Sequence, residues 1–264
     1  MVDRALGIAT TGMMARETDI AVISHNLANI STNGFKKQVA QFQDLPYQLI
    51  SRASNNGSVS TAGLSIGLGT ELSGTYSLNT PGDLLTTYGE LDFAIDGTES
   101  SRGYFKIDMP DGTIAYTRDG NFNKNANGEI VTKAGYTVAP GISVPQGASI
   151  KVDEFGNIYA TLPGNNGAQN QIGTFDIADF PNTSGLQPVG GNLFIQTPSS
   201  GDVIIGTAGT NGLGKVAQGK LEASNVVPVN ELTDLITAQR GYELCSNIIK
   251  ASDEMLQTVN RMKS

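Results

Sequence analysis

The sequence predicts an α+β protein in which N- and C-terminal helices flank an extended arm and a mainly antiparallel β domain. Near both ends of the 264-residue chain, apolar residues recur every three or four positions, which is the period of a helix. Between residues 91 and 216 they alternate with polar residues, which is the period of a strand. We expect four segments: the N-terminal helix at 1–35, the arm at 36–85, the β domain at 86–227 and the C-terminal helix at 228–264.

A seven-residue repeat predicts the N-terminal helix. Both apolar rows of the repeat lie on one face of a helix, so they predict the contact face of a coiled coil. The polar and glycine-containing run at 29–34 should end the helix. Position a holds Leu6, Met13, Ile20 and Leu27, and position d holds Ala9, Ile23 and Ile30, with Arg16 as the exception.

The arm is predicted from a change in composition. From residue 37 to 85 the chain is rich in Ser, Asn, Gly and Thr, with Pro46 early and a polar patch at 51–60, so we expect an extended segment with at most short strands. Apolar residues on either side of the patch should dock on a neighbouring subunit. They are Leu45, Tyr47, Leu49, Ile50, Leu64, Ile66 and Leu68.

Alternation and turn residues predict the β domain. Leu91, Phe93 and Ile95 alternate with polar or small residues, as in a strand with one buried face. Turns rich in Gly, Asn and Asp separate the strands, and residues 150–152 and 157–159 should pair around the turn at 153–156.

The C-terminal helix should begin near Pro228, because proline loses no hydrogen bond in a first helical turn. Its repeat supplies the partner for the N-terminal helix, in an antiparallel or folded-back coiled coil. Position a holds Leu235, Tyr242, Ile249 and Leu256, and position d holds Ala238, Cys245 and Val259, with Ser252 as the polar interruption.

The C-terminal helix carries a second apolar row that a two-stranded coil would leave exposed. An exposed apolar row usually marks a contact with another molecule, so we interpret it as a surface for self-assembly. The row consists of Leu244, Ile248, Ala251 and Met255, and Ile8, Ala15 and Val22 form a weaker equivalent on the N-terminal helix.

Both ends of the chain resemble the bacterial flagellar rod and hook family. The resemblance rests on HNLANISTNGFK at 25–36, LEASNV at 221–226 and QRGYE at 239–243. The family usually has Asn in place of His25 and Ala in place of Gly241, and the glycine should cost about 1 kcal/mol of helix propensity. The segment at 44–69 resembles the insertion of the family's distal rod members.

The resemblance implies a structural subunit of the basal-body distal rod, which polymerises helically into the driveshaft that transmits torque to the hook. Its expected partners are other copies of itself, the proximal rod and hook-side axial proteins, the surrounding basal-body ring proteins and the flagellar export apparatus. The expected location is the basal body, across the periplasm. The first twenty residues lack the apolar region of a cleaved signal peptide, so export should not use one.

Two alternatives stay open. One is a proximal rod or hook subunit of the same axial structure. The other is a β-rich envelope protein that binds or hydrolyses carbohydrate, which the absence of Trp and an aromatic content of 6% disfavour.

No catalytic, cofactor or metal site is expected. The run GTNGLGK at 209–215 matches a phosphate-binding loop, but Val216 stands where that loop needs Ser or Thr. Residues 119–127 alternate like a calcium loop, but Lys124 and Ile130 replace its required Gly and Glu. His25 and Cys245 lie within predicted coiled-coil helices, so neither is expected to act in catalysis.

Charge and hydropathy exclude two further classes of partner. The formal net charge of −8 disfavours binding to nucleic acid. No apolar stretch is long enough to span a bilayer, so we expect no direct membrane insertion.

Overall fold

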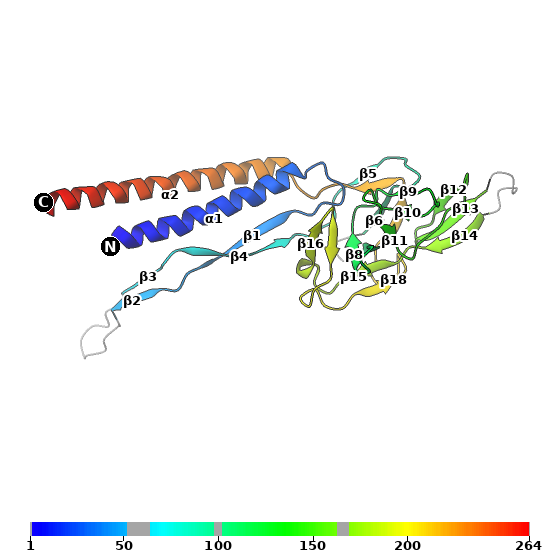
Figure 1. The fold of residues 1–264 in the computed structure, drawn as a ribbon, viewed down its shortest axis with the longest axis horizontal. Helices are drawn as coiled ribbons and strands as arrows, with labels where there is room; N and C mark the ends of the chain where they lie inside the picture. The colour runs from blue at the N-terminus through cyan, green and yellow to red at the C-terminus, as the bar shows by residue number, and fades with distance from the viewer. Residues whose placement is uncertain (1, 52–63, 98–101, 163–168, 264) are drawn as a thin grey trace. The chain divides into compact units, whose positions relative to one another are not determined.

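The computed structural model describes residues 2–51, 64–97, 102–162 and 169–263 (Figure 1). Two terminal helices and mainly antiparallel strands confirm the predicted α+β class. The chain divides into two compact units. The helical unit comprises Met1–Leu27, Gln38–Tyr76 and Val227–Ser264, and the β unit comprises Ala28–Lys37 and Ser77–Val226.

In the helical unit, α1 (Val2–Ala28) and α2 (Pro228–Lys263) lie side by side and run antiparallel (Figure 1). A Cβ atom added to Gly12 would lie 3.2 Å from Cys245 Sγ, and one added to Gly241 would lie 3.0 Å from Arg16 Nε. Further along, Asn26 Nδ2 donates a hydrogen bond of 3.1 Å to Glu231 Oε2. For the residues in contact, the residue number therefore increases along α1 as it decreases along α2.

The end of α1 corrects one detail of the predicted repeat. Ile30, assigned to a d position, lies in a turn after the helix, because α1 ends at Ala28. Within this turn, Thr32 N donates to Asn29 O at 3.2 Å. Gly34 has a φ of +68°, a left-handed conformation that glycine adopts without strain.

The arm forms a two-stranded antiparallel ribbon with longer strands than predicted. Strands β1 (Gln38–Asp44) and β4 (Thr70–Ser77) pair near its base, and β2 (Gln48–Ser51) and β3 (Leu64–Ile66) pair further out. The predicted polar patch lies outside the described residues, except for the backbone of Ser51. The ribbon contacts α1, because a Cβ atom on Gly69 would lie 2.1 Å from Thr11 Oγ1.

The β unit is built on one large sheet, with strand order β16-β17-β8-β7-β11-β10-β9; β15 pairs with both β7 and β18. All neighbouring strands described in this sheet pair antiparallel. Its strands are β7 (Tyr104–Asp108), β8 (Ile114–Thr117), β9 (Asn123–Lys124), β10 (Ile130–Val131), β11 (Thr137–Val138), β15 (Ile177–Asp179), β16 (Gln187–Gly190), β17 (Leu193–Ile195) and β18 (Ile204–Gly206).

Smaller sheets complete the β unit. The hairpin predicted around residues 153–156 is confirmed, since Lys151 pairs with Tyr159. Besides a short 3-10 helix at Thr183–Gly185, the remaining elements form a three-stranded sheet and two strand pairs. They are β12 (Ser149–Val152), β13 (Asn157–Thr161) and β14 (Gln169–Thr174); β6 (Phe93–Asp96) with β19 (Lys215–Gln218); and β5 (Leu84–Thr86) with β20 (Lys220–Glu222).

The core of the β unit corrects the prediction for β6. Phe93, Ala94 and Ile95 are all buried, so this strand is covered on both faces and not on one. Phe93 packs edge-on against Phe175, with ring centroids 5.1 Å apart. Large and small residues therefore alternate in β6 because the two buried faces offer different amounts of space, and not because one face contacts water.

Candidate functional site

The predicted contact rows of α1 and α2 include most of the buried positions described in these helices, although Asn26 and Glu231 are also buried and lie outside the rows. Ala9 and Ile23 on α1, and Ala238 and Ser252 on α2, are buried. The exceptions are Arg16 and Tyr242, which are exposed, and Val259, whose side chain lies outside the described residues. The others are half-buried: Leu6, Met13, Ile20, Leu27, Leu235, Cys245, Ile249 and Leu256.

The second row of α2 is exposed to solvent. Leu244, Ile248 and Met255 are 64%, 49% and 51% exposed, which is high for large apolar side chains. The same row continues towards the start of α2 through exposed Leu232 and Ile236. These two residues were missed by the sequence analysis, although their four-residue spacing from one another continues the spacing of Leu244 and Ile248. Apolar side chains thus lie on two different faces of α2.

The apolar residues of the arm are only partly described. Tyr47 and Leu68 are exposed, while Leu45 and Ile66 are half-buried. Pairing of Gln48 with Ile66 brings the two apolar flanks of the arm together. The side chains of Leu49, Ile50 and Leu64 lie outside the described residues.

Asn26 joins three elements of the helical unit. Its Oδ1 accepts a hydrogen bond of 2.8 Å from Gln38 N, and its Nδ2 donates one of 2.8 Å to Gln38 O. The same Nδ2 reaches Glu231 Oε2 on α2. Because Asn26 is buried, each of these bonds replaces one that water would make in the unfolded chain.

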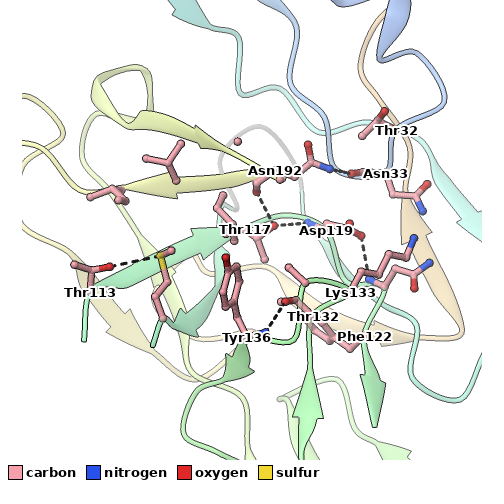
Figure 2. Close-up of a pocket in the computed structure, with 18 of the residues that line it drawn as sticks. Thr32, Asn33, Thr113, Thr117, Asp119, Phe122, Thr132, Lys133, Tyr136 and Asn192 are labelled. Carbon is pink, nitrogen blue, oxygen red and sulfur yellow. Dashed lines mark hydrogen bonds between the residues drawn. The ribbon is translucent and has the colours of Figure 1, made fainter. Parts of the chain in front are cut away.

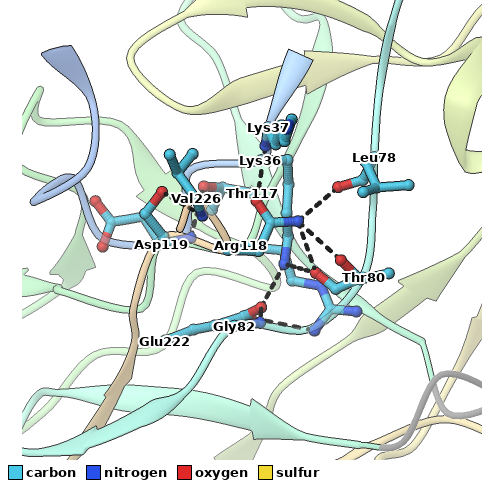
Figure 3. A network of polar contacts seen from close by, with 12 residues as sticks. Lys36, Lys37, Leu78, Thr80, Gly82, Thr117, Arg118, Asp119, Glu222 and Val226 are labelled. Carbon is cyan, nitrogen blue, oxygen red and sulfur yellow. Dashed lines mark hydrogen bonds and ion pairs between the residues drawn. The ribbon is translucent and has the colours of Figure 1, made fainter. Parts of the chain in front are cut away.

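A buried ion cluster in the β unit joins segments that are far apart in the sequence (Figure 3). Lys36 Nζ forms an ion pair with Glu222 Oε1, and Arg118 Nη1 lies 3.3 Å from Glu222 Oε2. These three side chains are at most 3% exposed. Lys36 Nζ also donates to Thr80 O at 2.8 Å. Burial lowers the pKa of Lys36, and Glu222 opposes that shift.

Backbone contacts surround the ion cluster. Gly34 N donates to Glu222 O at 2.8 Å, and Gly82 N donates to Glu222 Oε1 at 2.9 Å. Asn225 Oδ1 accepts a bond of 2.7 Å from Lys37 N. The runs at 25–36 and 221–226, on which the resemblance rests, therefore meet here. The cluster was not predicted, because each charged residue taken alone reads as exposed.

Tyr104 lies against the ion cluster. The Arg118 guanidinium carbon is 5.2 Å from the centre of the Tyr104 ring, within the range of a cation–π contact. The Tyr104 hydroxyl has no hydrogen-bond partner among the described residues. Burial raises the pKa of Tyr104 to about 12.

A pocket of about 920 Å³ opens beside the turn at 31–33 (Figure 2). Several polar groups around it bind one another. Asn192 Nδ2 donates to Asn33 O at 2.9 Å, and Thr117 Oγ1 donates to Asn192 O at 2.8 Å. Asp119 Oδ1 accepts from Asn121 N at 3.0 Å, and burial raises the pKa of Asp119. These bonds give the polar groups a structural role.

The remaining candidate motifs take structural positions. Lys215 begins β19, not a helix, and its Nζ lies 2.6 Å from Glu154 Oε2 in an exposed ion pair. Asn125 Oδ1 accepts bonds from Asn127 N and Glu129 N, so the predicted calcium-like segment includes a turn. His25 is exposed, and Cys245 lies half-buried beside Gly12.

Within residues 2–51, 64–97, 102–162 and 169–263, no group of three His, Cys, Asp or Glu residues could hold a metal ion. None of the described helices is both long and apolar enough to cross a membrane.

Three family models match this chain. They are "Flagella basal body rod protein" at residues 6–36, "Flagellar hook protein FlgE/F/G D1 domain" at 94–160 and "Flagellar basal body rod FlgEFG protein C-terminal" at 217–262. Among solved structures, the flagellar hook protein FlgE2 of Helicobacter pylori is 15% identical with a TM-score of 0.25, covering 62% of this chain and 47% of that chain.

Curated relatives are similar over nearly the whole length. The flagellar basal-body rod protein FlgG of Agrobacterium fabrum is 44% identical over 98% of both chains. The FlgG protein of Caulobacter vibrioides is 42% identical, over 99% of this chain and all of its own. That of Bacillus subtilis is 36% identical, over 98% of this chain and 99% of its own. The chain belongs to the family of flagellar basal-body rod proteins.

Proposed function

We propose that this protein is a structural subunit of the flagellar distal rod, which polymerises helically and transmits torque to the hook. The observation that carries the proposal is the pair of apolar faces on α2. One face contacts α1 through positions such as Cys245, and the other exposes Leu244 and Ile248. A helix that is apolar on two faces needs a second partner, and full-length similarity to rod proteins named FlgG supports another copy as that partner.

The contact rows of α1 and α2 form an antiparallel coiled coil in this proposal. Gly12 lies by Cys245, Arg16 by Gly241, and Asn26 by Glu231. Each step along α1 is matched by an equal step back along α2, which is the register of two antiparallel helices. The half-buried leucines and isoleucines of both rows would be covered further when neighbouring subunits pack around them.

The arm docks on a neighbouring subunit and stiffens the polymer. Exposed Tyr47 and Leu68, with partly covered Leu45 and Ile66, give the ribbon apolar anchors for such a contact. The family resemblance implies that this insertion makes the distal rod straight, because additional contacts between neighbours resist the sliding that bending requires.

The same proposal extends to partners and location. The polymer joins the proximal rod at one end and hook-side axial proteins at the other, within the basal-body rings. It crosses the periplasm after passage through the flagellar export apparatus. Its role is mechanical, so no enzymatic activity and no cofactor are proposed.

Polymerisation of the purified full-length protein tests this function. Electron microscopy should show straight filaments, and Leu244→Asp with Ile248→Asp should prevent them, because the new charges replace apolar side chains that assembly buries. Gln239→Asp is the control, since it places a charge on the same helix at another exposed position. A wild-type protein that stays monomeric, or a double variant that still forms filaments, would contradict the proposal.

A further inference from the structure

The helical unit contains an open groove of about 300 Å³ between α1 and the arm ribbon. A cavity of about 150 Å³ lined by apolar side chains can hold a benzene molecule, so this groove has room for about two large side chains. Met14 on α1 and Leu72 on β4 line the groove and are 62% and 43% exposed. Glu71 adds one carboxylate to the lining.

On α2, exposed residues form a ridge. Ile236, Arg240, Leu244 and Ile248 are spaced four residues apart, so they follow one line along the helix with about 6 Å between successive residues. At 100° per residue, this line lies about 150° around α2 from the row that faces α1. Arg240 is the single cation among these four side chains.

Charge matches the groove to the ridge. Glu71 Oε1 accepts a hydrogen bond from the Gln43 side chain, and a carboxylate accepts more than one such bond. Arg240 presents a planar guanidinium that can bind a carboxylate with two parallel hydrogen bonds. An apolar ridge with one central cation therefore fits an apolar groove with one carboxylate.

We infer that the α2 ridge of one subunit occupies the groove of a second copy, with Arg240 against Glu71. This inference rests on the proposed function and names the contact by which copies join. Within one chain, α1 contacts α2 at Gly12 and the ribbon at Thr11, so groove and ridge lie on different outward surfaces. A contact between two different surfaces repeats from copy to copy, so it builds a ring or an open helical polymer and not a twofold-symmetric dimer. The helical polymer is the form that the proposed function requires.

Charge reversal tests the contact. Arg240→Glu and Glu71→Arg should each raise the critical concentration for polymerisation about tenfold or more, because each places like charges together in a desolvated contact. The double variant should return to within about threefold of wild type. Lys250→Glu is the matched control, with the same change of charge at another exposed position on α2. Equal polymerisation of all variants, or no rescue in the double variant, overturns the inference.

Disulfide crosslinking gives an independent measurement. In a Cys245→Ala background, Leu72→Cys and Ile236→Cys proteins should crosslink when mixed under oxidising conditions, whereas Leu72→Cys and Asp253→Cys should not. Filaments without this crosslink would refute the groove contact and leave the proposed function standing. Absence of filaments would refute the proposed function. In that case, the presence or absence of the crosslink in the mixture would still show whether the groove contact forms.

Discussion

Replacing Glu222 by Gln should destabilise the β unit strongly. The substitution keeps the shape of the side chain but removes the negative charge that Lys36 and Arg118 both bind. Breaking a buried ion pair from one side costs about 3–5 kcal/mol, because the remaining charge stays buried. For a folding unit of this size, about 2–4 °C of melting temperature is lost per kcal/mol, so we expect a decrease of about 6–20 °C.

Calorimetry of the full chain can measure this decrease. Lys215→Gln is the matched control, because it removes one partner of an ion pair that solvent screens, with side chains 58% and 68% exposed. We expect the control to melt close to wild type. If Glu222→Gln also melts within about 2 °C of wild type, the ion cluster does not stabilise the β unit and the reasoning fails.

The pH dependence of the Glu222→Gln variant provides a second check. The folded-state pKa of Lys36 is already lowered from 10.5, chiefly by burial, and loss of Glu222 removes an opposing influence. The unfolded chain then binds more protons than the folded chain below pH 10.5, so stability rises with pH in that window. The difference in melting temperature between the variant and wild type should therefore narrow from pH 7 to pH 9.5, and a difference that widens would contradict this explanation.

Three further substitutions test other contacts. Tyr104→Phe should change stability little at pH 7, because the hydroxyl has no partner among the described residues. From pH 10 to 12 wild type should lose about 2 kcal/mol more than the variant in chemical denaturation, since a folded pKa of about 12 lies above the unfolded value of 10.0. Gly34→Ala should lower the melting temperature of the β unit more than Gly112→Ala; both positions have positive φ, but only at Gly34 would the new Cβ lie 2.6 Å from a backbone nitrogen. Asn26→Ala should weaken the helical unit by about 1–3 kcal/mol, measured as faster proteolysis of α1, whereas equal cleavage rates would mean that water replaces the lost hydrogen bonds.

The helices and local hairpins could be predicted because their signals lie within short stretches of sequence. The turn at 153–156 and the alternating strands beside it specify the pairing of Lys151 with Tyr159. The arm strands were underestimated because the composition of the segment carries no sign of its contact with α1, as at Gly69 and Thr11. Contacts between distant segments leave no periodic signal in either one.

In the candidate site too, local features could be predicted from the sequence and contacts between distant segments could not. Leu244, Ile248 and Met255 could be predicted as an exposed row, because a two-stranded coil accounts for only one face of α2. The position of Met14 in the groove could not be predicted, because part of the groove is formed by the arm. Ile30 was placed in the helix because a repeat continues in a sequence even where turn residues stop the helix.

The ion cluster explains why motifs at opposite ends of the chain belong together physically. Lys36 lies two residues before β1, and Glu222 lies six residues before α2, so each charge sits beside a point where the chain passes from the β unit to the helical unit. Arg118, from the middle of the sequence, binds the same carboxylate as Lys36. Pulling on either connection would therefore have to separate a buried ionic contact, which costs far more than breaking an exposed one. For a subunit that transmits torque, this arrangement places a buried ionic contact beside both connections through which the chain enters and leaves the β unit.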